Sequence, residues 1–391
     1  MAESLAAEQG RLRITALKAV QIKSCRQSLV KVETDAGIVG YGEAGGPGPM
    51  IRGNLRYLET YLLGKDPLEI DRLFNLMINL QHPNRPHIPT VSGVDIALWD
   101  IAGKVLDRPV SQLLRGQYRT EIPIYINTGG PADWFDKGAC RTWAAEIEAH
   151  PFRLKAVKMD FKRLLGNPLP RDLMHLGHRT TMLRVSDIKL IGRAYRNLRD
   201  ALDPRIDMIV HCHNELDLPS AIGLAKAVAP IQPLWIEDAL PVLYNDTWKR
   251  FKDASPVPVL TGEKLELTRE FEPFLVNQAV DMLQPDILFA GGLTGSWQIA
   301  DLADRYYIPV TAHNIGTVVQ NAVTAHFAAS ARNFVMTETR LGSGHTLDDL
   351  IEEKLEVVDG KLAVPTGPGL GITIVEEAVR ANMAPGEPYW D

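Results

Sequence analysis

The sequence has few cysteines and no long apolar run. Its three cysteines, Cys25, Cys140 and Cys212, lie far apart and include no Cys-x-x-Cys pair. This excludes a disulfide framework and predicts a reduced, cytoplasmic compartment. No stretch approaches the roughly 18 consecutive apolar residues of a membrane span. The N-terminal MAESLAAEQGRLR has no apolar core preceded by basic residues, so we expect neither a secretory signal nor a membrane partner.

Positive charge is also scarce. The 42 lysines and arginines are outnumbered by 48 aspartates and glutamates, which gives a net charge of −6. Nucleic acids and anionic membranes are bound by concentrated basic faces, so neither is expected as a partner. The chain of 391 residues is 45% apolar, which is ordinary for a globular protein and long enough for two or three domains. A small-molecule ligand is the partner that remains.

The first 120 residues have the pattern of an α+β unit. Residues 14–45 alternate like an antiparallel sheet, with residues 34–37 (Thr-Asp-Ala-Gly) as a turn. From Ser92, a possible N-cap, apolar residues recur at helical spacing until Pro109. We therefore predict a sheet followed by a helix in this part of the chain.

A different rhythm begins after residue 120. Eight short β-like runs recur, most of them ending in a polar or acidic residue and separated by helical segments: 125–127, 156–160, 208–213, 234–238, 259–263, 282–286, 309–313 and 334–338. One terminal residue from each of the last six gives intervals of 26, 26, 23, 27 and 25 residues. This is the length of one strand–helix unit. Eight such units predict a (β/α)8-type barrel, whereas a doubly wound open sheet would not explain the polar residues at the strand ends.

In such a barrel all strand ends open on one face, where active sites lie. The residues predicted on this rim are His211, Glu237, Glu263, Asp286, His313 and Glu338. The interval from Asp160 to His211 is twice the usual length, and the excess lies in residues 162–184. This segment carries Lys162, Arg163, Arg171, Arg179 and Arg184 against Asp172 alone. It is either a solvated surface loop or a lid that favours an anionic substrate.

The rim residues have the chemistry of a metal and acid–base site. Glu237 and Glu263 end adjacent strands, so their carboxylates can converge on Mg²⁺. His211 and His213 are two residues apart and would share a face, whereas Cys212 between them would point to the helical layer, so a His-Cys-His zinc site is geometrically poor.

Asp286 and His313 end neighbouring strands, where the carboxylate can hold the imidazole as a base. Glu338 can donate a hydrogen bond if burial keeps it protonated.

Several segments resemble the mandelate racemase and muconate-lactonizing branch of the enolase superfamily. They are 92–116, His211-Cys212-His213 followed by Ile236-Glu237-Asp238-Ala239, 259–263, 282–294, 310–329 and 365–372. The resemblance covers residues 12–391. It implies a modified (β/α)7β barrel over residues 121–360 and a capping domain over residues 1–120, completed by about residues 361–391. A homo-oligomer is also expected.

The resemblance implies a role for each rim residue. Glu237 and Glu263 would be the second and third magnesium ligands, Asp286–His313 the base dyad, and Glu338 the partner of an enolate-like intermediate. The first ligand should be aspartate but is His211, so Mg²⁺ should bind weakly or be replaced by another divalent ion. Glu215 and Asp217 are alternative carboxylates beyond the strand, and a protonated His211 could stand in for the cation. His211→Asp is expected to strengthen Mg²⁺ binding.

Racemases of this branch carry Lys-x-Lys on the second strand, and here it is Lys158-Met159-Asp160. His213 matches the general acid of acid-sugar dehydratases of the galactonate and gluconate type. The resemblance therefore implies a metal-assisted dehydratase that converts a sugar acid to a 2-keto-3-deoxy acid, with Lys158 and Asp160 in the substrate site. One alternative is a racemase or epimerase with Lys158 as second base. Another is a non-catalytic ligand-binding barrel.

Overall fold

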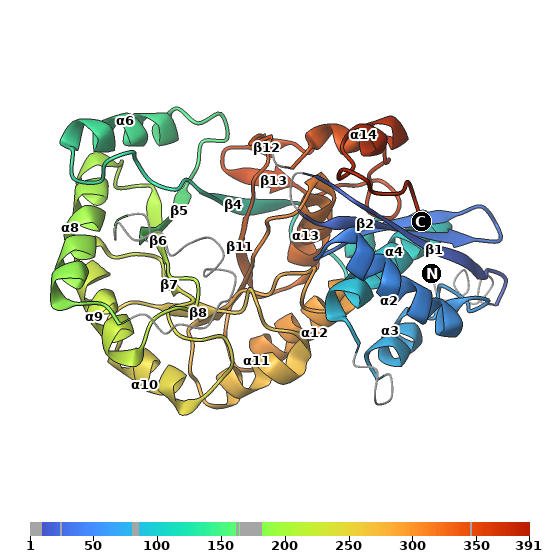
Figure 1. The fold of residues 1–391 in the computed structure, drawn as a ribbon, viewed down its shortest axis with the longest axis horizontal. Helices are drawn as coiled ribbons and strands as arrows, with labels where there is room; N and C mark the ends of the chain where they lie inside the picture. The colour runs from blue at the N-terminus through green and yellow to red at the C-terminus, as the bar shows by residue number, and fades with distance from the viewer. Residues whose placement is uncertain (1–9, 24–25, 80–85, 162–163, 165–181, 345) are drawn as a thin grey trace.

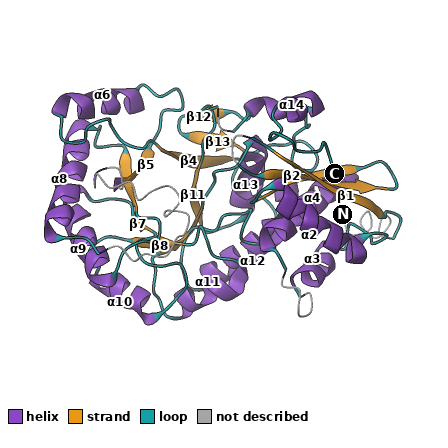
Figure 2. Cartoon of the chain, viewed as in Figure 1, coloured by secondary structure: helices purple, strands orange, loops and turns teal. Residues whose placement is uncertain are grey.

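The computed structural model describes residues 10–23, 26–79, 86–161, 164, 182–344 and 346–391. An N-terminal sheet with its helices lies beside a larger parallel barrel, which is on the left in Figure 1. Helices line the outside of the barrel strands (Figure 2). Both marked chain ends lie on the side of the N-terminal sheet. Among the described residues, no helix combines the length and apolar character needed to cross a membrane.

The N-terminal sheet has the antiparallel order predicted from the alternation. Its strands are β1 (Ile14–Gln21), β2 (Ser28–Thr34) and β3 (Val39–Ala44). The predicted turn joins β2 to β3, and the Gly37 N–H donates to the Thr34 carbonyl at 3.1 Å. Gly37 has a φ of 74°, which glycine adopts without steric cost.

Helices α2 (Gly48–Leu62), α3 (Ile70–Ile78) and α4 (Ile88–Leu106) follow this sheet. Helix α4 packs so closely on β3 that a Cβ atom at Gly42 would lie 2.1 Å from the Gly93 carbonyl oxygen. Glycine at position 42 therefore permits the contact between sheet and helix.

The predicted start of the helix at Ser92 is wrong. Helix α4 begins at Ile88, with a proline in its first turn, and Ser92 lies inside it. The Ser92 hydroxyl donates to the Ile88 carbonyl at 2.9 Å, a bond that satisfies a serine within a helix. Proline is favoured in a first turn because no intrahelical N–H is needed there.

The eight predicted strands form one closed parallel barrel, which confirms the expected fold. They are β4 (Glu121–Asn127), β5 (Ala156–Asp160), β6 (Asp207–His211), β7 (Ile236–Glu237), β8 (Val259–Thr261), β9 (Met282–Leu283), β10 (Val310–Ala312) and β11 (Phe334–Glu338). Each strand pairs with the next, and β11 pairs with β4 to close the ring.

In the described part of the chain, seven helices connect the barrel strands. They are α6 (Lys137–Glu148), α8 (Val185–Ala201), α9 (Leu218–Val228), α10 (Asp246–Ala254), α11 (Leu267–Val276), α12 (Gly292–Arg305) and α13 (Val318–Ser330), with a 3-10 turn η2 (Ala229–Ile231) after α9. After β11, the described residues form only the short 3-10 turn η3 (Asp348–Leu350) before the next strand. The barrel is thus of the modified (β/α)7β type.

The C-terminal segment ties the barrel to the N-terminal sheet. Strands β12 (Val357–Val358) and β13 (Lys361–Ala363) form a hairpin, and β13 pairs with the start of β4. Beyond it, α14 (Glu376–Ala381) leads to Asp391, whose carbonyl accepts from the Ala19 N–H at 2.9 Å. A short helix, α5 (Val110–Leu114), links α4 to the barrel.

The barrel interior is apolar along the strands and polar near their C-terminal ends. Tyr125, Ala156, Ile209, Trp235 and Leu260 form a buried cluster inside the ring. Outward-facing side chains such as Met208 and Val210 instead join the larger core between strands and helices. Because side chains alternate along each strand, the next inward positions after Ala156, Ile209 and Trp235 are the polar rim residues Lys158, His211 and Glu237.

Candidate active site at the barrel mouth

The polar residues predicted at the rim are brought together at one end of the barrel. All but two of them, Asp160 and His213, are buried. Those within the last residues of a strand are Lys158, Asp160, His211, Glu237 and Glu338. Those one to three residues beyond a strand are His213, Glu263, Asp286 and His313, because β6 and β8–β10 are shorter than the sequence runs.

Lys158 lies between two glutamates. Its Nζ atom donates to Glu237 Oε1 and to Glu338 Oε2, both at 2.8 Å, and only 1% of its surface is exposed. Burial alone would lower the lysine pKa, but the charges of Glu237 and Glu338 raise it well above its ordinary value. Lys158 is therefore a fixed ammonium group, which cannot accept a proton.

Asp286 and His313 form the predicted dyad. His313 Nδ1 lies 2.6 Å from Asp286 Oδ2, and Nε2 is left facing Glu263 Oε2 at 3.5 Å. Burial alone would lower the His313 pKa, but the Glu263 charge and the bond to Asp286 raise it to about 9. Any cation that neutralises Glu263 would remove the largest raising influence and so lower the His313 pKa.

A buried network holds this dyad from behind. Gln320, on α13, donates from Nε2 to Asp286 Oδ1 at 2.9 Å, and its Oε1 accepts from the Gly316 N–H at 2.6 Å. Glu43, from β3 of the N-terminal sheet, accepts from the N–H groups of Thr317 and Gln320, each at 2.9 Å. The orientation of Asp286 is thus coupled to the contact between the N-terminal sheet and the barrel.

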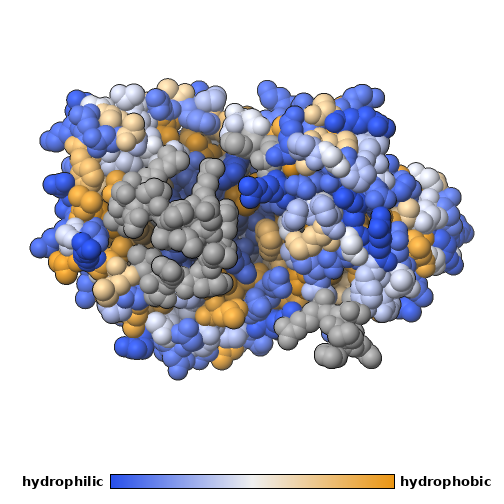
Figure 3. Space-filling model, viewed as in Figure 1, coloured by the Kyte–Doolittle hydropathy of each residue, from blue (hydrophilic) through white to orange (hydrophobic). Residues whose placement is uncertain are grey.

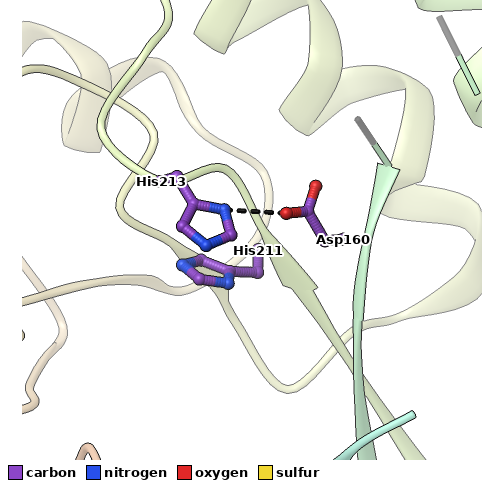
Figure 4. A group of neighbouring side chains, drawn as sticks. All are labelled: Asp160, His211 and His213. Carbon is purple, nitrogen blue, oxygen red and sulfur yellow. Dashed lines mark ion pairs between the residues drawn. The ribbon is translucent and has the colours of Figure 1, made fainter. Parts of the chain in front are cut away.

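His213 is placed differently from the prediction. Strand β6 ends at His211, and His213 has a φ of 57°, so it lies in a left-handed turn and does not share a strand face with His211. The two imidazoles nonetheless stack, with ring centroids 3.7 Å apart (Figure 4). His213 Nδ1 lies 2.8 Å from Asp160 Oδ2, but without the alignment of a hydrogen bond. Cys212 is buried in the core outside the barrel, as predicted.

His211 is buried among possible metal ligands. Its Nε2 atom lies 3.5 Å from Glu237 Oε1 and 3.6 Å from Glu263 Oε2. Burial, followed by the Lys158 charge, lowers its pKa well below the ordinary value. The imidazole is therefore neutral, which is the form that binds metals, and a protonated His211 in place of a cation is disfavoured.

Two groups of described side chains have the spacing of a metal site. One is Asp160, His211 and His213, and the other is His211, Asp238 and Glu263, with the ligand atoms of each group within 4.8 Å of one another. Neither ring nitrogen of His211 has a hydrogen-bond partner among the described residues, and the same holds for Glu263 Oε2. These buried nitrogen and oxygen atoms lack hydrogen-bond partners, and they are atoms of the kind that ligate a divalent cation.

Most of the predicted basic insertion lies outside the described residues. This applies to Lys162, Arg163, Arg171 and Arg179. Arg184 is described, and it is an exposed residue at the start of α8. In the view of Figure 3, hydrophilic residues border a recess between the barrel and the N-terminal part of the chain.

Sequence reasoning missed three residues that shape the site. Asp238 was treated only as part of a motif, although it follows Glu237 directly. Lys264 donates to the His213 carbonyl at 3.2 Å and to Asn214 Oδ1 at 2.9 Å, which holds the turn that carries His213. Gln320 is visible only as a polar residue in an apolar helix, and that pattern is the signal that could have found it.

Two family profiles match the chain. The Mandelate racemase / muconate lactonizing enzyme N-terminal domain matches residues 8–115, and the Enolase C-terminal domain-like profile matches residues 141–378. Together they cover both parts of the fold described above.

Curated relatives match nearly the whole chain. A D-xylonate dehydratase from Haloferax volcanii is 32% identical, over 93% of this chain and 87% of the relative. A D-galactonate dehydratase from Variovorax paradoxus is 28% identical, over 97% of each chain. Dehydratases are hydro-lyases, so the relatives belong to one class of enzyme.

Solved structures agree with the fold. A mandelate racemase/muconate lactonizing enzyme-like protein from Rubrobacter xylanophilus is 27% identical and superimposes with a TM-score of 0.86, over 97% of this chain and 99% of the other. An enolase from Agrobacterium radiobacter with bound Na and L-malate is 25% identical, with a TM-score of 0.83 over 96% and 99%. The chain belongs to the mandelate racemase/muconate lactonizing enzyme branch of the enolase superfamily, whose members bind a divalent metal.

Proposed function

We propose that this protein is an acid-sugar dehydratase, which removes the α-proton and the β-hydroxyl of a sugar acid to give a 2-keto-3-deoxy acid. The observation that carries the proposal is the pair of histidines at the mouth. His313, bonded to Asp286, and His213, beside Asp160, are a separate base and acid that follow different strands. The dehydratase names of the relatives support the same reaction class.

The roles follow from this arrangement. Neutral His313 accepts the α-proton at Nε2, since Nδ1 is held by Asp286. Electrons from the C–H bond form the enediolate and then expel the β-hydroxyl, which leaves as water with a proton from His213. The enol product tautomerises to the 2-keto-3-deoxy acid. A divalent cation, Mg²⁺ or a replacement, would supply the charge that stabilises the substrate carboxylate and the enediolate.

Lys158 separates this proposal from a racemase. Inversion would require a second base, and the sequence offered Lys158 for that role. Its ammonium group donates to both Glu237 and Glu338, so it has no lone pair to offer. We propose that Lys158 binds the substrate carboxylate and balances charge. We also propose that the Lys158–Glu338 pair donates the hydrogen bond that stabilises the intermediate.

The test is a panel of sugar acids that includes D-xylonate, D-galactonate and D-gluconate, each with Mg²⁺, Mn²⁺ or Zn²⁺. We expect a 2-keto acid from at least one, with one deuterium at C3 when the reaction runs in D₂O. His313→Asn should abolish it. Deuterium in recovered substrate of both configurations, without keto acid, would instead indicate a racemase. Thermal shifts without turnover would indicate a ligand-binding barrel.

A further inference from the structure

Glu237, predicted as a metal ligand, already has protein partners for both of its oxygens. Oε1 accepts from Lys158 Nζ at 2.8 Å, and Oε2 accepts from the Trp235 indole N–H at 3.2 Å. The side chain is fully buried, so these donors take the place of water. A cation approaching Oε1 would be repelled by the Lys158 ammonium, which binds the same atom.

Asp238, the next residue, is in the opposite situation. It too is fully buried, and its Oδ1 atom accepts from the Thr261 hydroxyl at 2.6 Å. Its Oδ2 atom has no hydrogen-bond partner among the described residues. A buried carboxylate oxygen without a donor is costly unless a proton or a cation satisfies it.

Two further unsatisfied side chains lie at the same place. His211 is 2% exposed and both its nitrogens lack hydrogen-bond partners in the described part of the chain, as does Glu263 Oε2. Ligand atoms of His211, Asp238 and Glu263 lie within 4.8 Å of one another. Three side chains that follow three strands thus place ligand atoms around one point, and each has a buried atom without a hydrogen-bond partner among the described residues.

We infer that a divalent cation binds to His211, Asp238 and Glu263, and that Glu237 is left to Lys158. The ligand set has shifted by one residue along the chain, in a site where position 211 supplies imidazole. This deepens the proposed function and rests on it, because the cation would serve the dehydration.

The donor set also selects the kind of cation. Two carboxylates balance a dication, and the neutral imidazole adds a nitrogen ligand. Mg²⁺ prefers an all-oxygen shell, whereas Mn²⁺, Fe²⁺ and Zn²⁺ accept imidazole together with carboxylates. We therefore expect Mn²⁺ and Zn²⁺ to bind more tightly than Mg²⁺.

The test compares two adjacent, isosteric substitutions in the full chain. Mn²⁺ binding is measured by calorimetry for the wild type, Asp238→Asn and Glu237→Gln, with Asp253→Asn as an exposed control. Loss of a ligand should weaken Mn²⁺ binding about 100-fold in Asp238→Asn, and the change in Glu237→Gln should be no more than about threefold. The reverse order would overturn the inference.

A measurement on the wild type covers the case in which Asp238→Asn fails to fold. Crystals soaked in Zn²⁺ should show an anomalous peak about 2.0–2.2 Å from Asp238 Oδ2 and Glu263 Oε2. A peak on Glu237 but not Asp238, or no peak, would overturn the inference.

The sugar-acid panel, run with and without EDTA, keeps the proposals distinguishable. Turnover without any bound cation overturns only this inference. A cation on Asp238 without turnover overturns only the proposed function.

Discussion

Two buried histidines of this protein have opposite surroundings. Around His313, burial alone would lower the pKa, but the Glu263 charge and the bond to Asp286 raise it to about 9. Around His326, burial lowers the pKa to about 4, and no carboxylate of the described residues offsets it. The partners of its ring are backbone groups: Nδ1 accepts from the Ser111 N–H at 3.2 Å, and the other ring nitrogen donates to the Leu370 carbonyl at 3.0 Å.

The difference shows what separates the histidine that we propose as the catalytic base from a histidine that only joins packed elements. Both side chains are buried, so burial does not distinguish them. Carboxylates surround the first, at the barrel mouth, and stabilise its protonated form, which suits the base that we propose. The second joins α5, α13 and the C-terminal segment, and a proton there would only break a packed contact.

Asp286→Asn should lower kcat more than Gln320→Leu or Asp160→Asn, because it changes the carboxylate that holds His313. The amide keeps the shape but can donate to Nδ1, which favours the wrong tautomer of His313. In a comparable Asp–His pair this costs roughly 10⁴-fold, so we expect kcat to fall by about 10³-fold or more. Steady-state keto-acid formation is the measurement, and Asp253→Asn is the matched exposed control. A loss below tenfold would show that His313 does not depend on Asp286.

The buried surroundings of His326 should affect how the free energy of unfolding depends on pH. The unfolded chain binds a proton at His326 below about pH 6.5, whereas the folded chain does so only below about 4. Stability therefore falls as the pH drops through this window, by about 3 kcal/mol from this residue alone.

Urea denaturation at several pH values, for the wild type and His326→Gln, tests this sign. Glutamine can accept from Ser111 and donate to Leu370 but does not titrate. The variant should lose less stability than the wild type between pH 6.5 and 4. Equal losses would mean that folding does not lower the His326 pKa.

The fold followed from the sequence because a strand–helix repeat forces one architecture. The strand ends did not, since Asp286 and His313 still pair in an isolated parallel bridge beyond β9 and β10, and Gly262, with a φ of 140°, breaks the alternation before Glu263. Alternation marks which way a side chain faces, and it does not mark where strand pairing ends. The sequence likewise did not mark where α4 begins. A serine can cap a helix or bond to a carbonyl within it, and the Ser92 hydroxyl bonds to the Ile88 carbonyl inside α4.

The residues that converge at the barrel mouth were named from the sequence, but the contacts between them were not. The turn that carries His213 depends on contacts from other loops, including those from Lys264 and the Asp238 carbonyl, which accepts from the Asn214 N–H. Left-handed backbone at residues other than glycine is set by such tertiary contacts. The pairing of Lys158 with Glu237 likewise joins side chains 79 positions apart in sequence.

Gln320→Leu tests whether the network behind Asp286 matters. Leucine removes the bond to Asp286 Oδ1 and leaves the Gly316 N–H unpaired. Groups that orient a reacting residue typically contribute 10- to 100-fold, and we expect kcat to fall by about that factor with KM nearly unchanged. Gln298→Leu, on α12, is the control, and Gln320→Glu should keep part of the acceptor function. A rise in KM at constant kcat would contradict a positioning role.

Asp160→Asn should have the smallest effect on catalysis. Asp160 Oδ2 lies 2.8 Å from His213 Nδ1, but the contact lacks hydrogen-bond alignment, and 35% of the His213 side chain is exposed to solvent. Water therefore screens this pair more than it screens the buried Asp286–His313 pair, whose bond is aligned. We expect kcat to fall about tenfold, with part of the loss recovered in Asp160→Glu. A loss as large as that of Asp286→Asn would show that the acid, like the base, depends on a fixed carboxylate, and the contrast between the two pairs would then be wrong.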